Sequence, residues 1–155
     1  MAYREGRNIE ASVIDWLTAA LTSAGWTGIR VEKVFAEIYK GSLPAICIEQ
    51  NPEETTKLEI GSKSWLKTFS INFRVFATSD GQRLDLKDFL VDLLENDINY
   101  YVYTVVNGII SSKVLSGRLI IREITRNEKE LINTENLSQE DKYRHVISVR
   151  AYIAD

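Results

Sequence analysis

This 155-residue chain has few of the residues on which many sites and scaffolds depend. Its one cysteine, Cys47, cannot form a disulfide within the chain. Together with the one histidine, His145, it cannot supply the Cys and His ligands of a structural zinc site. The eight scattered glycines form neither a GxxxxGK[ST] nor a GxGxxG loop. These absences exclude disulfide scaffolds, Cys/His zinc sites and the common nucleotide-binding motifs.

Long apolar runs and an excess of positive charge are missing as well. No stretch approaches 18 apolar residues, so we expect no membrane span. The charged N-terminus (1–7) is not followed by an apolar segment, so we expect no signal peptide. The net charge of −3 argues against a dedicated DNA or membrane-surface binder, whose surface would be basic. Length and composition are those of one ordinary globular domain.

The clearest pattern that is present runs from 63 to 98. Apolar and polar residues alternate over 68–77, which predicts a strand with one buried face and one wet face. A break follows at 78–81, and the spacing of apolar residues over 84–98 predicts an amphipathic helix. A strand, a turn and a helix that folds back over the strand form one packing unit.

The remaining elements follow from the same periodicities. Helical spacing predicts a first helix that Asn8 caps and Gly25 ends, and Asn107-Gly108 predicts a type I′ hairpin. A projecting β-arm or long hairpin is expected within 53–64, and a long acidic loop over 127–142. Strands are expected over 29–35, 43–50, 99–106, 109–115, 118–126 and 143–153. This order predicts a single α+β domain over 1–155: a mostly antiparallel (mixed) sheet with two main helices packed on one face, plus the arm.

Residues that carry catalysis are sparse. His145 is expected in mid-strand on the apolar face, where a hydrogen-bonded core residue is favoured over a base or ligand. Cys47 is expected to behave as a small hydrophobe. Glu140-Asp141-Lys142 is a triplet that suggests a magnesium-dependent nuclease, but its spacing is common by chance. We therefore expect no enzyme, no cofactor and no metal.

Arginines in the C-terminal strands suggest a second alternative. Arg118, Arg122 and Arg126, with Arg144 and Arg150, could line one face and contact phosphates. Polar strand edges that discourage aggregation explain the same pattern, and no row of stacking aromatics accompanies the arginines. A nucleic-acid-binding or Mg-dependent DNA-processing accessory domain is therefore kept as the alternative function.

The element order resembles that of a known family. The amphipathic helix over 9–24, the short apolar strand 43–49, the alternating strand 69–77, the helix from 84 and the β-rich C-terminal half resemble the tail terminator (tail completion) proteins of long-tailed bacteriophages and the related neck proteins. The resemblance covers most of the chain and rests on element order, size and residue texture, without a diagnostic motif. It implies a structural virion protein, assembled in the host cytoplasm, that forms a ring, commonly a hexamer.

Such a ring caps the tail tube and joins it to the head–tail connector, while DNA passes through without specific binding. The expected partners are therefore other copies of the chain, the tail tube protein and the connector protein. We expect the interfaces to lie in the arm, the acidic loop and the strand edges, at Lys57, Glu59, Trp65, Glu128, Glu130, Arg118 and Arg122. For Trp65, burial in the core is the alternative interpretation.

Overall fold

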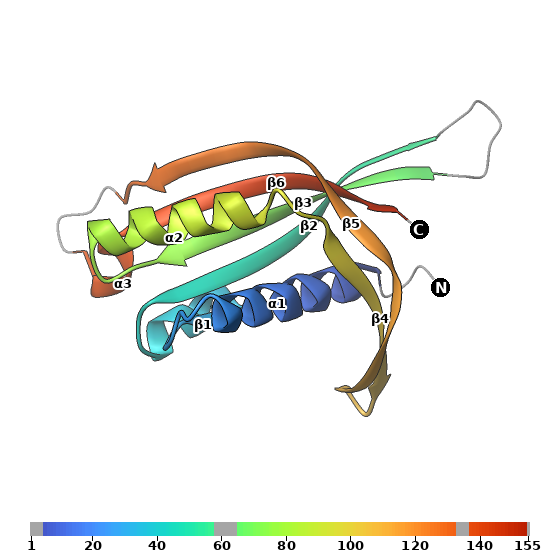
Figure 1. The fold of residues 1–155 in the computed structure, drawn as a ribbon, viewed down its shortest axis with the longest axis horizontal. Coiled ribbons are helices and arrows are strands. Elements are labelled where there is room, and N and C mark those ends of the chain that lie inside the picture. Colours follow the sequence, from blue (N-terminus) through green and yellow to red (C-terminus); the bar gives the residue numbers. More distant parts are fainter. Residues whose placement is uncertain (1–4, 58–64, 133–136, 155) are drawn as a thin grey trace.

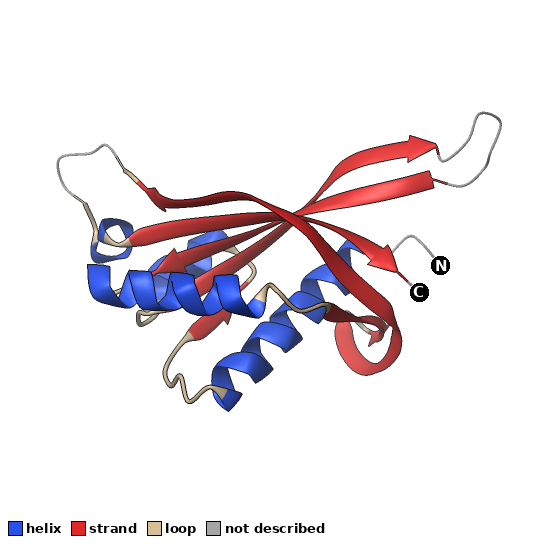
Figure 2. Ribbon diagram, turned by 45° about the horizontal axis from the view of Figure 1, so that its top comes forward, coloured by secondary structure: helices blue, strands red, loops and turns tan. Residues whose placement is uncertain are grey.

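The computed structural model describes residues 5–57, 65–132 and 137–154, without the side chains of 52–57, 65 and 66. Within these residues six strands form one sheet in the order β1-β2-β3-β6-β5-β4. The β1–β2 pair is parallel and the other four pairs are antiparallel. Figures 1 and 2 show a strongly curled sheet with α1 and α2 beside it. The predicted α+β class with a mostly antiparallel, mixed sheet is confirmed.

The elements follow the chain in a simple order. They are α1 (Glu5–Ser23), β1 (Arg30–Glu32), the 3-10 helix η2 (Phe35–Lys40), β2 (Ala45–Lys57), β3 (Trp65–Phe76), α2 (Asp80–Leu93), β4 (Ile98–Val106), β5 (Ile109–Glu130), α3 (Gln139–Lys142) and β6 (Arg144–Ala154).

The main core lies between the two long helices and one face of the sheet. Alternate side chains of β3, such as Ile71, Phe73 and Val75, are fully buried there, because every second residue of a strand points to the same face. Helix α1 contributes Ile9, Val13, Leu17 and Leu21, and α2 contributes Leu86, Leu90 and Leu94. Two partly buried tryptophans also pack against this core: Trp16 lies edge-on to Phe73, and Trp26 contacts Phe89.

Helix α2 begins earlier than predicted, at Asp80 instead of Leu84. The Ser79 hydroxyl accepts a hydrogen bond from the Gln82 backbone N–H at 3.2 Å. The Gln82 side chain in turn accepts one from the Thr78 backbone N–H at 2.8 Å. This exchange satisfies backbone donors at the helix start, as in a capping box. The four residues interpreted as a break therefore contain the helix cap and its first turn.

The other end of that helix and the start of α1 also differ from the prediction. Helix α2 ends at Leu93, and Ile98 is the first residue of β4. Helix α1 begins at Glu5, so Asn8 lies inside it and not at its cap. The predicted strand 29–35 is reduced to β1, because the chain turns into η2 at Phe35. The Phe35 ring packs there against Tyr39 and Phe76 on the second face of the sheet.

Strand β2 does not end at Asn51-Pro52, as the sequence predicted. A register shift between Pro52 and Glu54 accommodates the proline, and pairing with β3 continues to Lys57 and Trp65. In Figure 1 the paired ends of β2 and β3 extend away from both helices. The tip of the predicted arm, including Glu59, lies outside the described residues.

Strand β5 is the largest departure from the prediction. The predicted separation of the strands 109–115 and 118–126 is absent, and a register shift against β4 lies at Ser116-Gly117 instead. The strand first pairs with β4 and then, from Arg118 to Glu130, with β6. The predicted loop over 127–142 is therefore wrong at both ends, since 127–130 belong to β5 and 139–142 form α3. The hairpin at Asn107-Gly108 is confirmed, with φ values of 52° and 78° as a type I′ turn requires.

Candidate functional site

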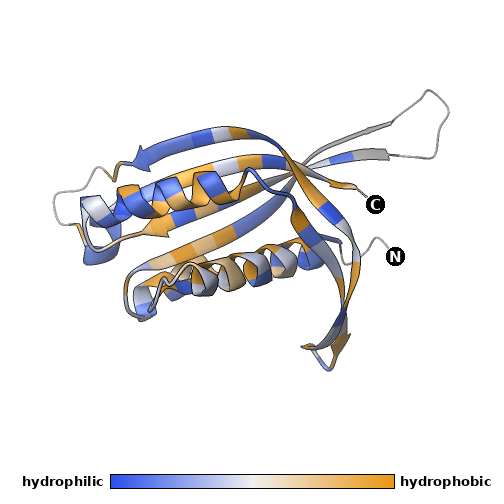
Figure 3. Ribbon diagram, viewed as in Figure 1, coloured by the Kyte–Doolittle hydropathy of each residue, from blue (hydrophilic) through white to orange (hydrophobic). Residues whose placement is uncertain are grey.

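The most unusual surface of the described chain is the β4–β5 hairpin, by which we mean residues 98–117. Six apolar side chains on it are 44–72% exposed: Val102, Val106, Ile109, Ile110, Val114 and Leu115. Val102 pairs directly with Val114, and Val106 pairs with Ile109, so the members of each pair share a face. Figure 3 shows hydrophobic residues along the ends of both strands. Uncovered apolar surface of this kind marks an interaction site or an aggregation hazard.

The hairpin also lacks the charges that normally protect a strand pair. Residues 98–112 contain no Asp, Glu, Lys or Arg, in a chain of which 26% is charged. Exposed strands usually carry charged residues or proline that prevent pairing with other chains. This uncharged run is the sequence signal that would have located the surface, and none of the seven predicted interface residues lies in it.

Polar side chains of α1 hold the hairpin in place. The Asn8 Oδ1 atom accepts a hydrogen bond from the Tyr103 backbone N–H at 3.2 Å. The Ser12 hydroxyl accepts one from the Tyr101 backbone N–H at 2.9 Å. Near the turn, the Arg7 guanidinium donates to the Gly108 carbonyl oxygen at 3.3 Å. The outer edge of β4 is therefore occupied by its own helix, and the hairpin has a defined position.

Replacing Asn8 with alanine is expected to lower the free energy of unfolding by about 1–3 kcal/mol, because it leaves the buried Tyr103 N–H without an acceptor. Urea denaturation followed by circular dichroism measures the loss. The control is Thr18→Ala, an exposed position of the same helix, which should change the free energy by no more than about 0.5 kcal/mol. Equal effects of the two changes would contradict the assigned role of Asn8.

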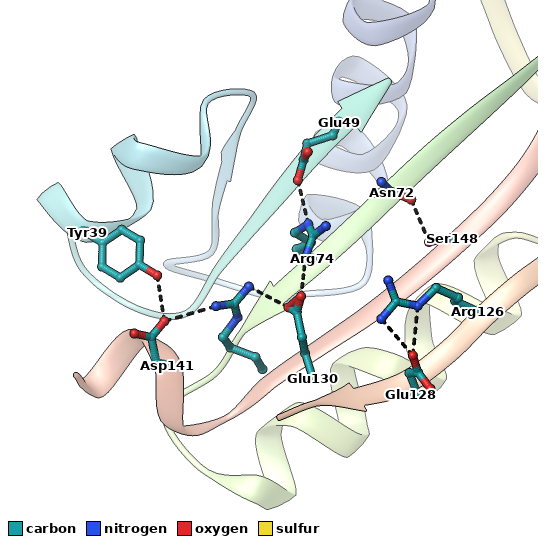
Figure 4. A network of polar contacts seen from close by, with 10 residues as sticks. Tyr39, Glu49, Asn72, Arg74, Arg126, Glu128, Glu130, Asp141 and Ser148 are labelled. Carbon is teal, nitrogen blue, oxygen red and sulfur yellow. Dashed lines mark hydrogen bonds and ion pairs between the residues drawn. The ribbon is translucent and has the colours of Figure 1, made fainter. Parts of the chain in front are cut away.

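The second face of the sheet, opposite the main core, carries a set of ion-paired side chains beside the apolar cluster around Phe35 and Phe76, and we call this charged part the polar face (Figure 4). Arg74 lies between two carboxylates: its Nε donates to Glu49 Oε1 at 2.6 Å, and its Nη1 contacts Glu130. Arg144 lies between Glu130, at 2.6 Å, and Asp141, at 3.2 Å. Arg126 pairs with Glu128, and Arg150 pairs with Glu123. The pairs of Arg74 and Arg144 share Glu130 and so form one connected lattice, whereas the pairs of Arg126 and Arg150 are separate.

This lattice ties the ends of several elements together. The Tyr39 hydroxyl from η2 donates to Asp141 Oδ1 of α3 at 2.7 Å, and the Arg144 guanidinium lies about 5 Å from the ring centres of both Phe35 and Phe76. Burial, and then the hydrogen bond to Asp141, raise the pKa of Tyr39 to about 12. Burial raises the pKa of Asp141, but hydrogen bonds from Tyr39 and Ser138 and the Arg144 charge outweigh it, and the net shift is downward. The lattice is a structural clamp.

The residues predicted as interfaces lie in several places. Arg118 is exposed and pairs with Asp97 at 2.8 Å, and Glu128 is exposed beside Arg126. Glu130 is largely enclosed between Arg74 and Arg144. Arg122 is exposed. Lys57 and Trp65 are paired across β2 and β3 at the end of the described arm, where their side chains are not described. The structure does not gather these residues into one site.

His145 is confirmed as a hydrogen-bonded core residue. It is 4% exposed, and its Nδ1 lies 2.7 Å from Arg83 Nη1. A guanidinium can only donate, so Nδ1 accepts, and Nε2–H donates to Asn127 Oδ1 at 2.7 Å. Both ring nitrogens are therefore engaged by protein groups. Burial and the neighbouring Arg83 charge lower the pKa of His145 to about 4.

The lowered pKa of His145 predicts a loss of stability in mild acid. The unfolded chain takes up the imidazole proton near pH 6.5, whereas the folded chain resists it down to about pH 4, so acid favours unfolding across that interval. The stability of the wild type relative to His145→Gln should therefore fall between pH 6.5 and 4, by up to about 3 kcal/mol. Urea titrations of both proteins at several pH values test this. A difference that stays constant with pH would contradict it.

Cys47 and the acidic triplet offer no reactive centre. Cys47 is fully buried beside Ile38 and Phe76, and burial followed by the nearby Glu49 charge raises the pKa of its thiol to about 11. Asp141 of the triplet is engaged by Tyr39, Ser138 and Arg144. Within 5–57, 65–132 and 137–154 no three His, Cys, Asp or Glu side chains are grouped as metal ligands would be. In the same residues no helix is both long and apolar enough to cross a membrane.

Neither the protein-family models nor the curated proteins contain a match to this chain.

Proposed function

We propose that this chain is a structural subunit of a phage tail, a tail terminator or neck protein without catalytic activity. It assembles as a ring, commonly of six copies, on the head-proximal end of the tail tube. The ring stops tube growth and presents a surface to the head–tail connector, and DNA passes through its lumen. The resemblance in element order suggests this role, and the fold is compatible with it.

One observation supports the proposal most strongly: the β4–β5 hairpin, which is uncharged over 98–112, exposes apolar side chains, yet α1 holds it firmly. A free monomer gains nothing from such a surface and is exposed to aggregation. A subunit that is covered by neighbours in an assembly needs an apolar contact of this kind, since buried interface cores are depleted of charge.

The polar face favours a DNA conduit over a DNA-binding domain. Arg118, Arg126, Arg144 and Arg150 all have acidic partners. Arginines that are already paired with acids displace few of the counterions condensed on DNA phosphates. The expected affinity of this face for DNA is therefore low. The nucleic-acid-binding alternative retains Arg122, which is exposed. A gel-shift series in increasing salt separates the two, because phosphate contacts would give steeply salt-dependent binding.

The proposal is tested by imaging tails from a phage that encodes this chain. An antibody against the chain, with gold detection in negative-stain micrographs, should label the head-proximal end of each tail. Light scattering on the purified protein records whether rings form without the tube. Label that is absent from the tail end, together with a protein that is monomeric at all concentrations, would overturn the proposal. A monomer alone would not, because the ring can form on the tube.

A further inference from the structure

Several strand edges in the described part of the chain have no strand partner, and two of them, in different strands, are considered for subunit contact. The first belongs to β5. Its residues 109–115 pair with β4 on one side, but β6 joins β5 only from Arg118 onward. The backbone groups of 109–115 on the second side therefore have no strand partner among the described residues. Lys113 is the one charged residue of this segment.

The second unpaired edge belongs to β1, the outermost strand at the other end of the sheet order. The Arg30 N–H donates to the Pro44 carbonyl at 3.2 Å, so the backbone groups of Arg30 and Glu32 point toward β2. Successive residues of a strand point their backbone groups to opposite sides, and Val31 and Lys33 therefore point away from β2. β1 itself ends at Glu32, and the chain bends at Lys33 and Val34, the second of which is 49% exposed.

The edge of β1 opens onto a groove of about 460 Å³. Ala11 and Ile14 of α1 line it, together with Val31 of β1 and Ile110 of the hairpin. Charges of both signs surround these apolar residues, including Glu10, Glu32 and Lys33. The groove thus combines apolar walls, a charged margin and a free strand edge, which are the features that bind an added strand.

We propose that β5 residues 109–115 of one copy add to the free edge of β1 in the groove of a second copy. The segment suits the groove chemically, because its residues are apolar or uncharged except for Lys113, and it contains no acid. Its apolar side chains would meet Ala11, Ile14 and Val31 of the acceptor. Since the donated hairpin forms one wall of its own groove, it cannot also fill that groove, and the donor has to be another molecule.

This contact has a defined symmetry. Donor and acceptor are different surfaces, so each copy donates once and accepts once, and the contact repeats head to tail. A head-to-tail contact closes into a ring when its rotation allows, and otherwise grows as a filament. The inference rests on the proposed function and specifies its subunit interface.

Two variants disable the two surfaces separately. The hairpin variant Val106→Lys/Ile109→Lys places charges on the donor. Lys33→Pro removes an outward-pointing N–H from the acceptor without removing a β1–β2 hydrogen bond, as proline requires at a strand edge. Each variant alone should be monomeric in light scattering under conditions in which the wild type assembles, and a 1:1 mixture should give a heterodimer, because one intact donor and one intact acceptor remain.

Cysteine cross-linking tests the contact without disabling it. A tagged Ser111→Cys protein and an untagged Lys33→Cys protein are mixed, bound together to tail tubes and then mildly oxidised. The native Cys47 is buried and is expected to stay unreactive. A disulfide between the two proteins is expected, and none with the control Asp92→Cys on the outer side of α2. Rings on the tubes without this cross-link, or a Lys33→Pro protein that assembles like the wild type, would overturn the inference and leave the proposed function intact. Wild-type protein that never reaches the tubes would overturn both.

Discussion

Lysine at both Val106 and Ile109 is expected to abolish assembly while the subunit remains folded. The two side chains pair at the end of the hairpin and are 55% and 72% exposed. Covering an apolar side chain of this size contributes about 1.5–3 kcal/mol, so losing both should weaken association by roughly 100-fold or more. Because they contribute little to the subunit's own core, its free energy of unfolding should change by no more than about 0.5 kcal/mol.

Sedimentation or light scattering measures the association, and urea denaturation measures the folding stability of the same samples. The matched control is Leu84→Lys, since Leu84 is 41% exposed but lies on α2, away from the hairpin. That variant should assemble like the wild type. Normal assembly of the hairpin variant, or an equal defect in the control, would show that exposed hydrophobicity at the hairpin has no specific role.

Replacing Arg144 with alanine is expected to lower the free energy of unfolding by about 3–5 kcal/mol. Its side chain is 6% exposed, lies about 5 Å from the ring centres of Phe35 and Phe76, and pairs with Glu130 and Asp141. Removing one partner of a buried ion pair leaves the other charge buried and uncompensated. For a domain of this length the expected fall in melting temperature is about 10 °C.

Arg126→Ala is the control for this prediction, because Arg126 makes an ion pair with Glu128 on the same face of the sheet but in a solvent-exposed position. Exposed pairs contribute no more than about 1 kcal/mol. Differential scanning calorimetry of the two variants beside the wild type makes the comparison. A loss from Arg144→Ala as small as that from Arg126→Ala would mean that the lattice does not clamp the fold.

The parts of the fold that sequence predicted correctly depend on local patterns. The alternation of apolar and polar residues over 69–77 predicts a strand correctly, because the helices bury one face of β3 and the other face carries Asn72 and Arg74. The Asn107-Gly108 turn is predictable because few other dipeptides adopt two successive positive φ values. Helix α1 is predictable from apolar spacing, although its start is not.

The errors arise where tertiary partners override local appearance. The sequence of 127–130 predicts a loop because Asn, Glu and Lys are poor strand formers. In the folded chain Asn127 accepts from His145, and Glu130 lies between two arginines, so distant residues stabilise this end of β5. The prediction of Asn8 as a helix cap is wrong for a similar reason. Its side-chain oxygen accepts a hydrogen bond from the Tyr103 backbone N–H of β4, 95 residues away.

The exposure of the β4–β5 hairpin was not predicted, because strand propensity does not reveal burial. Val102, Val106 and Val114 have the composition of core strand residues, and only the curl of the sheet around α1 shows that nothing in the described chain covers them. The absence of charge over 98–112 was visible in the sequence. Its meaning depends on exposure, which is a property of the whole fold.

A measurement of tube growth tests most directly whether this chain caps a tail tube through its apolar hairpin. Tail tube protein is polymerised, incubated with the wild type or with Val106→Lys/Ile109→Lys, and then supplied with fresh tube subunits, and the tube lengths are measured by electron microscopy. The wild type should leave the length distribution unchanged after the second addition, whereas tubes treated with the hairpin variant should elongate. Elongation that is equal with wild type, variant and no protein would contradict the account.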